Sequence, residues 1–478
     1  MLELQKQMDK GKLTSSELVL RSLERMEKLD GRLRAILAVN PEAAEIAAAL
    51  DEERLKSGPR SLMHGVPVII KDSVATKDKM PTTGGTVPLE SFFSSKDSFL
   101  VGKLRQAGAV ILAKSNLHEL SYGYATLSTL GGQTLNPYAP DRQPGGSSGG
   151  TAVAVATEMG VAGIGEDTAG SIRVPAAFNS LVGIRPTVGL VSRTGLIPIS
   201  PSRDTAGPIT RTVSDAAIML DAIAGYDPED SITASCVKKI PESYTAFLKP
   251  DGLQGARIGV VRELFGDDSD GSAAVNQVIN AAIEKMKTLG AEVVDPVEVP
   301  RLTEIVDREK YVFEGQAEWQ PAFNEFLGWA GDSAPIKSFR ELAESGKVGA
   351  HVIKMVTDAL GAAPPQEDID YLKTLTFAQR LAETGIHQVM AEHNLDALVY
   401  PAVKEPPALI GETQTGAIAT GLGARARFPS IVVPAGFTDD GFPVGIELLA
   451  RAYEEPRLIE LGYSFEQGTQ YRKPPEVD

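Results

Sequence analysis

The chain contains little cysteine and little histidine. Its 478 residues include one cysteine, Cys236, and five histidines. A single thiol forms no disulfide framework and no cysteine-rich metal site within the chain, and it is typical of a reducing compartment. The small number of histidines leaves few candidates for a catalytic imidazole. A general base of another residue type therefore has to be considered.

Long apolar runs and an excess of basic residues are also lacking. No apolar stretch approaches the ~18–20 residues of a membrane helix, and the first residues lack the basic and apolar regions of a signal peptide. Lysine and arginine total 47 against 63 aspartates and glutamates, so the net charge is −16. Such a surface repels phosphate backbones, and we expect neither nucleic acid nor a membrane as a direct partner. We expect a globular, cytoplasmic protein.

The sequence does contain short apolar runs that alternate with helical patterns, and hydrophobic residues make up 42% of it. Runs rich in β-branched residues predict strands, and apolar residues at helical spacing predict helices. The predicted strands are 66–70, 109–113, 161–164, 256–261, 395–400, 430–433 and 444–449. The predicted helices are 13–29, a segment after Pro41, 98–106, 151–157, 211–225, 273–289 and 456–467, with 301–390 mostly helical. This alternation indicates an α/β fold.

Domain boundaries are not marked in the sequence. At roughly 150 residues per domain, the length alone suggests about three domains. However, no internal repeat, low-complexity tract or flexible linker divides the chain. We therefore expect residues 1–478 to form one large domain.

A glycine- and serine-rich segment at 145–150, Gly-Gly-Ser-Ser-Gly-Gly, matches the G-x-S-x-G pattern of hydrolases whose nucleophile lies between a strand and a helix. Residues 137–144 contain three prolines and cannot form that central strand. The late histidines, His387 and His393, lie in a helical stretch. A phosphate-binding loop would end in Gly-Lys-Ser/Thr, whereas this segment leads into Gly-Gly-Thr. Taken alone, the segment is also compatible with a turn that has no chemistry.

A second serine, Ser171, follows the small residues of 167–170, Asp-Thr-Ala-Gly. Such a backbone can turn several N–H groups toward one point, as an oxyanion hole requires. A serine nucleophile needs a base, and a lysine acts as one only when burial lowers its pKa toward neutrality. Lys71 is the candidate because it follows the apolar strand 66–70. The alternative is a lysine at a strand end that pairs with Asp72.

Three motifs together resemble those of the amidase signature family. They are Val-Ile-Ile-Lys-Asp at 68–72, the segment 145–150, and Asp-Thr-Ala-Gly-Ser-Ile-Arg-Val-Pro-Ala at 167–176. The likeness continues at 182–187, 207–216, 433–436 and 442–449, and it covers 10–226 and 394–472 well and the middle third loosely. It implies a single domain with a mixed, twisted β-sheet core that helices cover on both faces.

The resemblance implies a Ser-cisSer-Lys triad. Ser171 is then the nucleophile, Ser147 the bridging serine on a cis peptide bond, and Lys71 the neutral base. The implied oxyanion hole consists of the backbone N–H groups of Thr168, Ala169, Gly170 and Ser171. The implied supporting residues are Gly146, Ser148 and Asp167. Neither a cofactor nor a metal is expected.

The chain departs from the family pattern in two places. The family usually has Thr-Asp-x-Gly-Gly-Ser before the nucleophile, where this chain has Glu-Asp-Thr-Ala-Gly-Ser at 166–171. Ala169 replaces a glycine, which a negative φ would allow, and Glu166 replaces a threonine and adds a charge close to the triad. Arg425 and Arg427 stand where small residues are more usual, and the sequence offers no role for them.

The resemblance places the substrate pocket largely in the variable helical region, about 300–390. Both tryptophans of the chain lie there, among the aromatic residues Tyr311, Phe313, Trp319, Phe323, Phe326 and Trp329. We expect Ile172, Trp319 and Trp329 to line an apolar pocket for an aryl or alkyl amide, an anilide or a carbamate (urethane). The alternative is that the aromatic residues form an ordinary helix core.

The expected activity is that of a free-standing amidase. It is a hydrolase of C–N bonds in linear amides, other than peptide bonds, that forms an acyl-enzyme on Ser171. The expected partners are a small-molecule amide or carbamate and a second copy of the chain in a homodimer. The alternative is the glutaminase (A-type) subunit of a tRNA-dependent amidotransferase complex, in which another subunit would contact the tRNA.

Overall fold

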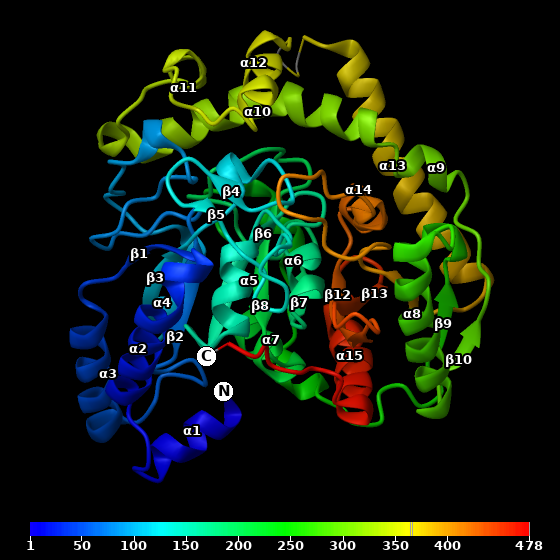
Figure 1. The fold of residues 1–478 in the computed structure, drawn as a ribbon, viewed down its shortest axis with the longest axis horizontal. Coiled ribbons are helices and arrows are strands. Elements are labelled where there is room, and N and C mark those ends of the chain that lie inside the picture. The colour runs from blue at the N-terminus through cyan, green and yellow to red at the C-terminus, as the bar shows by residue number, and fades with distance from the viewer. Residues whose placement is uncertain (364, 366, 478) are drawn as a thin grey trace.

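The structure is a computed structural model that describes residues 1–363, 365 and 367–477, without the side chains of 270, 308–314 and 418. Within these residues, an 11-stranded sheet has the order β1-β3-β2-β6-β8-β7-β12-β13-β11-β9-β10 (Figure 1). Its strands are β1 Ile36–Val39, β2 Pro67–Lys71, β3 Val110–Ser115, β6 Ala162–Asp167, β7 Val182–Arg185, β8 Thr205–Thr210, β9 Arg257–Val260, β10 Glu292–Val294, β11 Ala397–Pro401, β12 Ser430–Phe437 and β13 Pro443–Leu449. A separate hairpin consists of β4 Leu127–Ser128 and β5 Gly132–Gln133.

The central strands are apolar on both sides because helices cover both faces of the sheet. In β2, Val68 and Ile70 belong to one hydrophobic core and Ile69 belongs to the core on the other face. β2 runs parallel to both β3 and β6, whereas β8 runs antiparallel to β6 and β7. The sheet is therefore mixed, as predicted.

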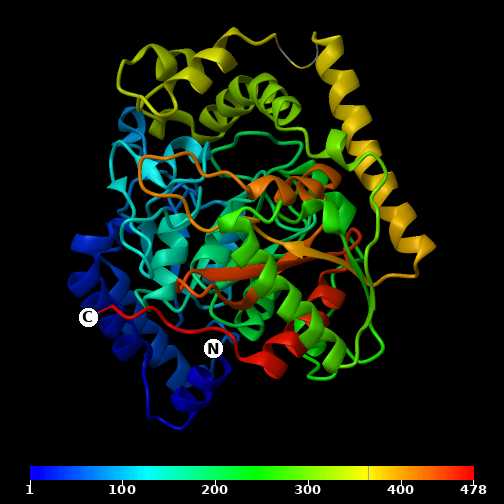
Figure 2. The same cartoon turned by 45° about the vertical axis from the view of Figure 1, so that its right-hand side comes forward.

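Helices from both ends of the chain form the two outer layers (Figures 1 and 2). The helices on the face of Val68 and Ile70 are α1 Leu2–Asp9, α4 Phe99–Gln106, α7 Val213–Ile223, α8 Asp270–Thr288 and α15 Glu455–Thr469. The opposite face carries α2 Ser15–Leu33, α3 Ala43–Ser57, α5 Gly149–Ala156, α6 Arg173–Phe178, α9 Leu302–Ile305, α13 Ile369–Glu392 and α14 Gly421–Ala426. The predicted α/β fold with helices on both faces is confirmed. None of the described helices has the length and apolar character needed to cross a bilayer.

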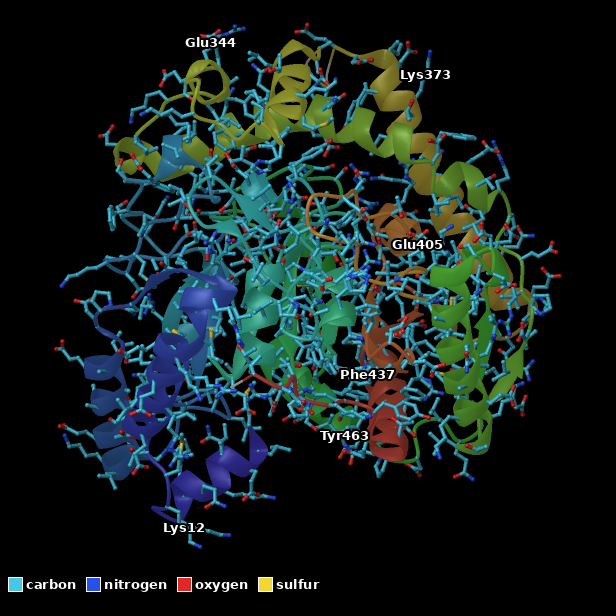
Figure 3. The ribbon with its side chains drawn as sticks, viewed as in Figure 1. Lys12, Glu344, Lys373, Glu405, Phe437 and Tyr463 are labelled. Carbon is cyan, nitrogen blue, oxygen red and sulfur yellow. The ribbon has the colours of Figure 1, made fainter. Side chains whose placement is uncertain are left out.

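A helical cap arches over one end of the body (Figure 1). It consists of α10 Arg308–Ala330, α11 Phe339–Glu344 and α12 Ile353–Gly361. Its aromatic side chains pack on Phe92, Leu120 and Ile197 of the body. Charged residues such as Glu344 and Lys373 point outward from the cap and from α13 (Figure 3). This partition of apolar and charged residues fixes the cap on the body.

Candidate active site

The sequence motifs converge where two parallel strands end. Lys71 is the last residue of β2, Asp167 is the last residue of β6, and the two strands pair in register through Ile70 and Ile164. The segment 145–150 leads into α5, which packs against β2 and β6. The sheet thus brings the lysine and both serine-containing loops to one edge.

Lys71 and Ser147 form a buried hydrogen bond. The Nζ of Lys71 donates to the Oγ of Ser147 at 2.7 Å, and both side chains are fully buried. The peptide bond between Gly146 and Ser147 is cis. A Cβ at Gly146 would lie 2.8 Å from the backbone carbonyl carbon of Tyr124, so the loop has room only for glycine there. The serine is therefore held against the lysine by tight backbone packing.

Ser171 lies on the neighbouring loop at the start of α6 and is 6% exposed. Its carbonyl accepts the N–H of Ser148 at 3.3 Å, while the Oγ of Ser148 donates to the carbonyl of Glu166 at 3.2 Å. Gly170 has φ +130°, and a Cβ there would lie 2.6 Å from the Oγ1 of Thr420. These contacts fix the loop of Ser171 against that of Ser147.

The backbone before Ser171 is held by several side chains. Ala169 lies outside the left-handed region of backbone conformation. Its carbonyl accepts from the hydroxyl of Tyr124 at 2.8 Å and from that of Thr420 at 2.6 Å. The N–H of Gly170 donates to the Oδ1 of Asp167 at 2.8 Å. The structure thus commits the Gly170 N–H to the loop itself, and an oxyanion hole from the N–H groups of the other three residues stays a prediction.

Two buried arginines that the sequence analysis did not single out anchor this loop. Arg173 and Arg185 contact the Oδ1 of Asp167 at 3.1 and 2.8 Å, and Arg173 also contacts the Oε1 of Glu447 at 2.7 Å. Burial would raise the pKa of Asp167, but the two guanidinium groups hold that pKa well below its usual range. Both arginines fall inside motifs shared with the amidase signature family, at 167–176 and 182–187. Their position there was the available signal.

The charge environment of Lys71 combines burial with a nearby carboxylate. Burial lowers the pKa of Lys71, and the negative charges of Glu166, Asp167 and Asp204 oppose that shift. The Oε2 of Glu166 lies 3.7 Å from the Lys71 Nζ, and both side chains are buried. Burial raises the pKa of Glu166 to about 7, although Lys71 acts in the opposite direction. Neutral lysine is therefore accessible nearer to physiological pH than it would be on the surface.

A cleft of about 170 Å³ reaches this centre from the cap side. Trp329 and Phe326 lie on its cap wall, and Glu166 lies on its floor. Trp319 is fully buried instead, stacked on Tyr122 with ring centroids 4.9 Å apart.

Ile172 lies elsewhere, in the hydrophobic core beneath the loop. Of the three predicted pocket residues, Trp329 alone is among the residues that line this cleft in the described part of the chain. The side chains of Tyr311 and Phe313 lie outside the described residues.

The two unexplained arginines occupy α14 and its end. Arg425 is fully buried within that helix. Arg427 follows the helix in the left-handed conformation and pairs with Glu383 of α13 at 3.2 Å. Arg427 therefore helps to connect α14 to the long helix α13, at a distance from the reacting groups.

Comparison with known proteins gives matches along nearly the whole chain. A family model described as Amidase matches residues 17–459. The chain is 36% identical to the "Probable amidase" of Arabidopsis thaliana, over 97% of this chain and 89% of the relative. It is 35% identical to the A-type subunit of the glutamyl-tRNA(Gln) amidotransferase of Gloeothece citriformis, over 99% of this chain and 98% of the relative. The crystal structure of native peptide amidase from Stenotrophomonas maltophilia superposes with a TM-score of 0.92 at 38% identity, covering 99% of this chain and 98% of that one.

Proposed function

The chain belongs to the amidase family, whose members hydrolyse C–N bonds, and we propose that it is a free-standing amidase acting on a small linear amide. The observation that carries this proposal is the buried contact between Lys71 and Ser147 beside the loop of Ser171. It supplies a base, a proton bridge and a nucleophile without histidine.

In the acylation step, the Oγ of Ser171 attacks the amide carbonyl as its proton passes to the Oγ of Ser147. The proton of Ser147 moves to the neutral Nζ of Lys71. Backbone N–H groups of the loop before Ser171 stabilise the oxyanion of the tetrahedral intermediate. The proton then returns through Ser147 to the leaving nitrogen, and the C–N bond breaks. Water reverses the sequence and releases the acid from Ser171.

For the substrate, we propose an aryl or alkyl amide, an anilide or a carbamate. The support is the cleft beside Glu166, whose cap wall carries Phe326 and Trp329. Flat aromatic side chains offer apolar contact area to such a group. The peptide amidase with which the chain superposes adds peptide amides to the compounds worth testing.

The second candidate is a glutaminase subunit of a tRNA-dependent amidotransferase. Similarity to the amidotransferase chain of Gloeothece citriformis supports it at 35% identity, against 36% for the plant amidase. These identities do not separate the two functions. The structural match to a peptide amidase over 99% of the chain favours the free-standing enzyme.

The direct test is the substitution Ser171→Ala assayed on a panel of aliphatic amides, anilides, carbamates, peptide amides and glutamine. We expect hydrolysis to be abolished with the fold intact, because the variant has no nucleophile. Ser464→Ala is the control, since Ser464 is a buried serine on α15 that bonds to the Pro250 carbonyl, and it should keep its rate. Turnover by Ser171→Ala above a few per cent would remove Ser171 as the nucleophile.

A further inference from the structure

Glu166 places a carboxylate against the proposed base. Its Oε2 lies 3.7 Å from the Nζ of Lys71, and its side chain is 1% exposed. The hydroxyl of Ser121 donates to the same oxygen at 3.3 Å. Within the described residues, Glu166 is the carboxylate that lies within 4 Å of this lysine. The contact joins the ends of β2 and β6 through charge.

The other charged groups around the pair are already engaged. Asp167 is neutralised by Arg173 and Arg185, and Asp204 accepts the hydroxyl of Thr168 at 2.6 Å. The Oδ2 of Asp204 also accepts the two backbone N–H groups of residues 199 and 200.

Two further titratable groups lie near the pair. His118 stays neutral because burial, with His351 and Lys71, lowers its pKa to about 3. Arg193, on the cleft wall, pairs with Asp230. Glu166 is therefore the anion best placed to respond to the charge of Lys71.

A buried lysine without a counter-charge is a poor proton acceptor. Burial favours its neutral form, but it equally disfavours the ammonium that must form when the lysine takes the proton of Ser147. A carboxylate a few ångströms away stabilises that ammonium, as an aspartate stabilises the imidazolium of a serine–histidine triad. The threonine that is usual at this position carries no such charge.

We propose, on the basis of the Ser171–Ser147–Lys71 relay, that Glu166 is a positioning residue that stabilises the ammonium of Lys71 during acylation. The proton balance of the step is unchanged: Ser171 loses a proton, Ser147 passes one on, and Lys71 gains one beside the Glu166 carboxylate. Glu166 keeps its negative charge throughout. The consequence is a base that is neutral before attack and yet basic enough to accept the proton.

The test is the pH dependence of Ser171 sulfonylation by phenylmethylsulfonyl fluoride, followed by intact mass. In this reaction the Ser171 oxygen forms a bond to sulfur, fluoride leaves, and the serine proton passes to Lys71. Replacing Glu166 by Gln or Thr removes the charge that favours the ammonium. We therefore expect the acid limb of the rate profile to move about 1–3 pH units lower, with a lower rate on the plateau.

The control is Glu325→Gln, which makes the same chemical change on the exposed cap side of the same cleft. It should leave the acid limb where it is. A structural role for Glu166 would reduce the rate without moving the limb, so an unchanged or raised midpoint in both Glu166 variants overturns the proposal. Thermal unfolding of each variant identifies loss of fold, and Glu166→Thr provides the residue usual in the family if Glu166→Gln is unstable.

The same probe separates this inference from the proposed function. If Ser171→Ala still reacts at the same site, the relay itself is wrong, and Glu166 falls with it. If Ser171→Ala and Lys71→Met are inert while the Glu166 variants keep the wild-type acid limb, the relay stands and only the role of Glu166 is overturned.

Discussion

Two fully buried lysines on adjacent strands have different surroundings. Lys71 at the end of β2 contacts a serine hydroxyl, whereas Lys114 on β3 donates to the carbonyl of Val74 at 2.5 Å and to the hydroxyl of Thr82 at 2.9 Å. Burial lowers the pKa of Lys114 to about 8, and Asp72 opposes the shift from 3.8 Å away. Burial of a lysine is thus not enough to make a base. The group that the lysine contacts decides its role.

The pair allows a matched test of the proposed base. We expect Lys71→Met to lower kcat/KM at least ~10²-fold, on the scale of general acid–base contributions, because no other group can take the proton of Ser147. Lys114→Met makes the same change one strand away and should lower stability rather than the rate per folded molecule. Amide hydrolysis, normalised to the folded fraction from circular dichroism, checks both. A near-normal rate for Lys71→Met would contradict the relay.

At the scale of elements, the junction between β6 and α6 depends on a buried ionic network. Arg173, the first residue of α6, connects Asp167 of β6 with Glu447 of β13 and also donates to the carbonyl of Thr420 at 2.8 Å. One side chain thus ties together a strand end, a helix start and a strand on the far side of the sheet.

Removing that side chain would leave two buried carboxylates with fewer partners. We expect Arg173→Met to lower the free energy of unfolding by about 3–5 kcal/mol, the usual cost of breaking a buried ion pair on one side. Arg340→Met is the matched control, because Arg340 pairs with Glu344 on the exposed surface of α11, and we expect a change within about 1 kcal/mol. Urea unfolding measures both. Equal stability of the two variants would show that the network contributes little.

The predicted elements differ from the observed ones mainly where local patterns conflict with pairing. All seven predicted strands lie in the sheet, whereas β1, β7, β8 and β10 were not predicted. In β8, the Gly207-Pro208 pair is typical of a turn. The segment nevertheless forms a strand because β6 pairs with it over five residues, while β7 pairs only beyond Pro208. Pairing between distant segments overrides the local preference.

At the scale of the whole molecule, the open question is whether the chain works alone. Its net charge of −16 disfavours direct contact with tRNA, so a glutaminase subunit would need a partner for that contact. The free-standing enzyme needs none. Charge therefore favours the first candidate function without testing it.

We expect the purified chain to hydrolyse small amides without any other protein and to elute as a homodimer. Size-exclusion chromatography with light scattering gives the assembly, and the amide panel applied to the same fractions gives the activity. Adding charged tRNA should leave the rates unchanged, because the acidic surface offers it no binding site. Activity confined to glutamine, or dependent on partner chains, would instead support the role in an amidotransferase.

The sequence by itself determined the α/β alternation, the two serine-containing loops and the lysine that follows an apolar strand. These features are local, since β-branched runs, glycine positions and motif spacing act over a few residues. Only the tertiary structure decided that Glu166 faces Lys71 across 95 positions of sequence, that two arginines hold Asp167, and that Trp329 rather than Trp319 lines the cleft. Strand order and cap packing set those contacts, and charge acts through space rather than along the chain. The shortage of histidine pointed to a lysine base, and the fold supplied the carboxylate beside it.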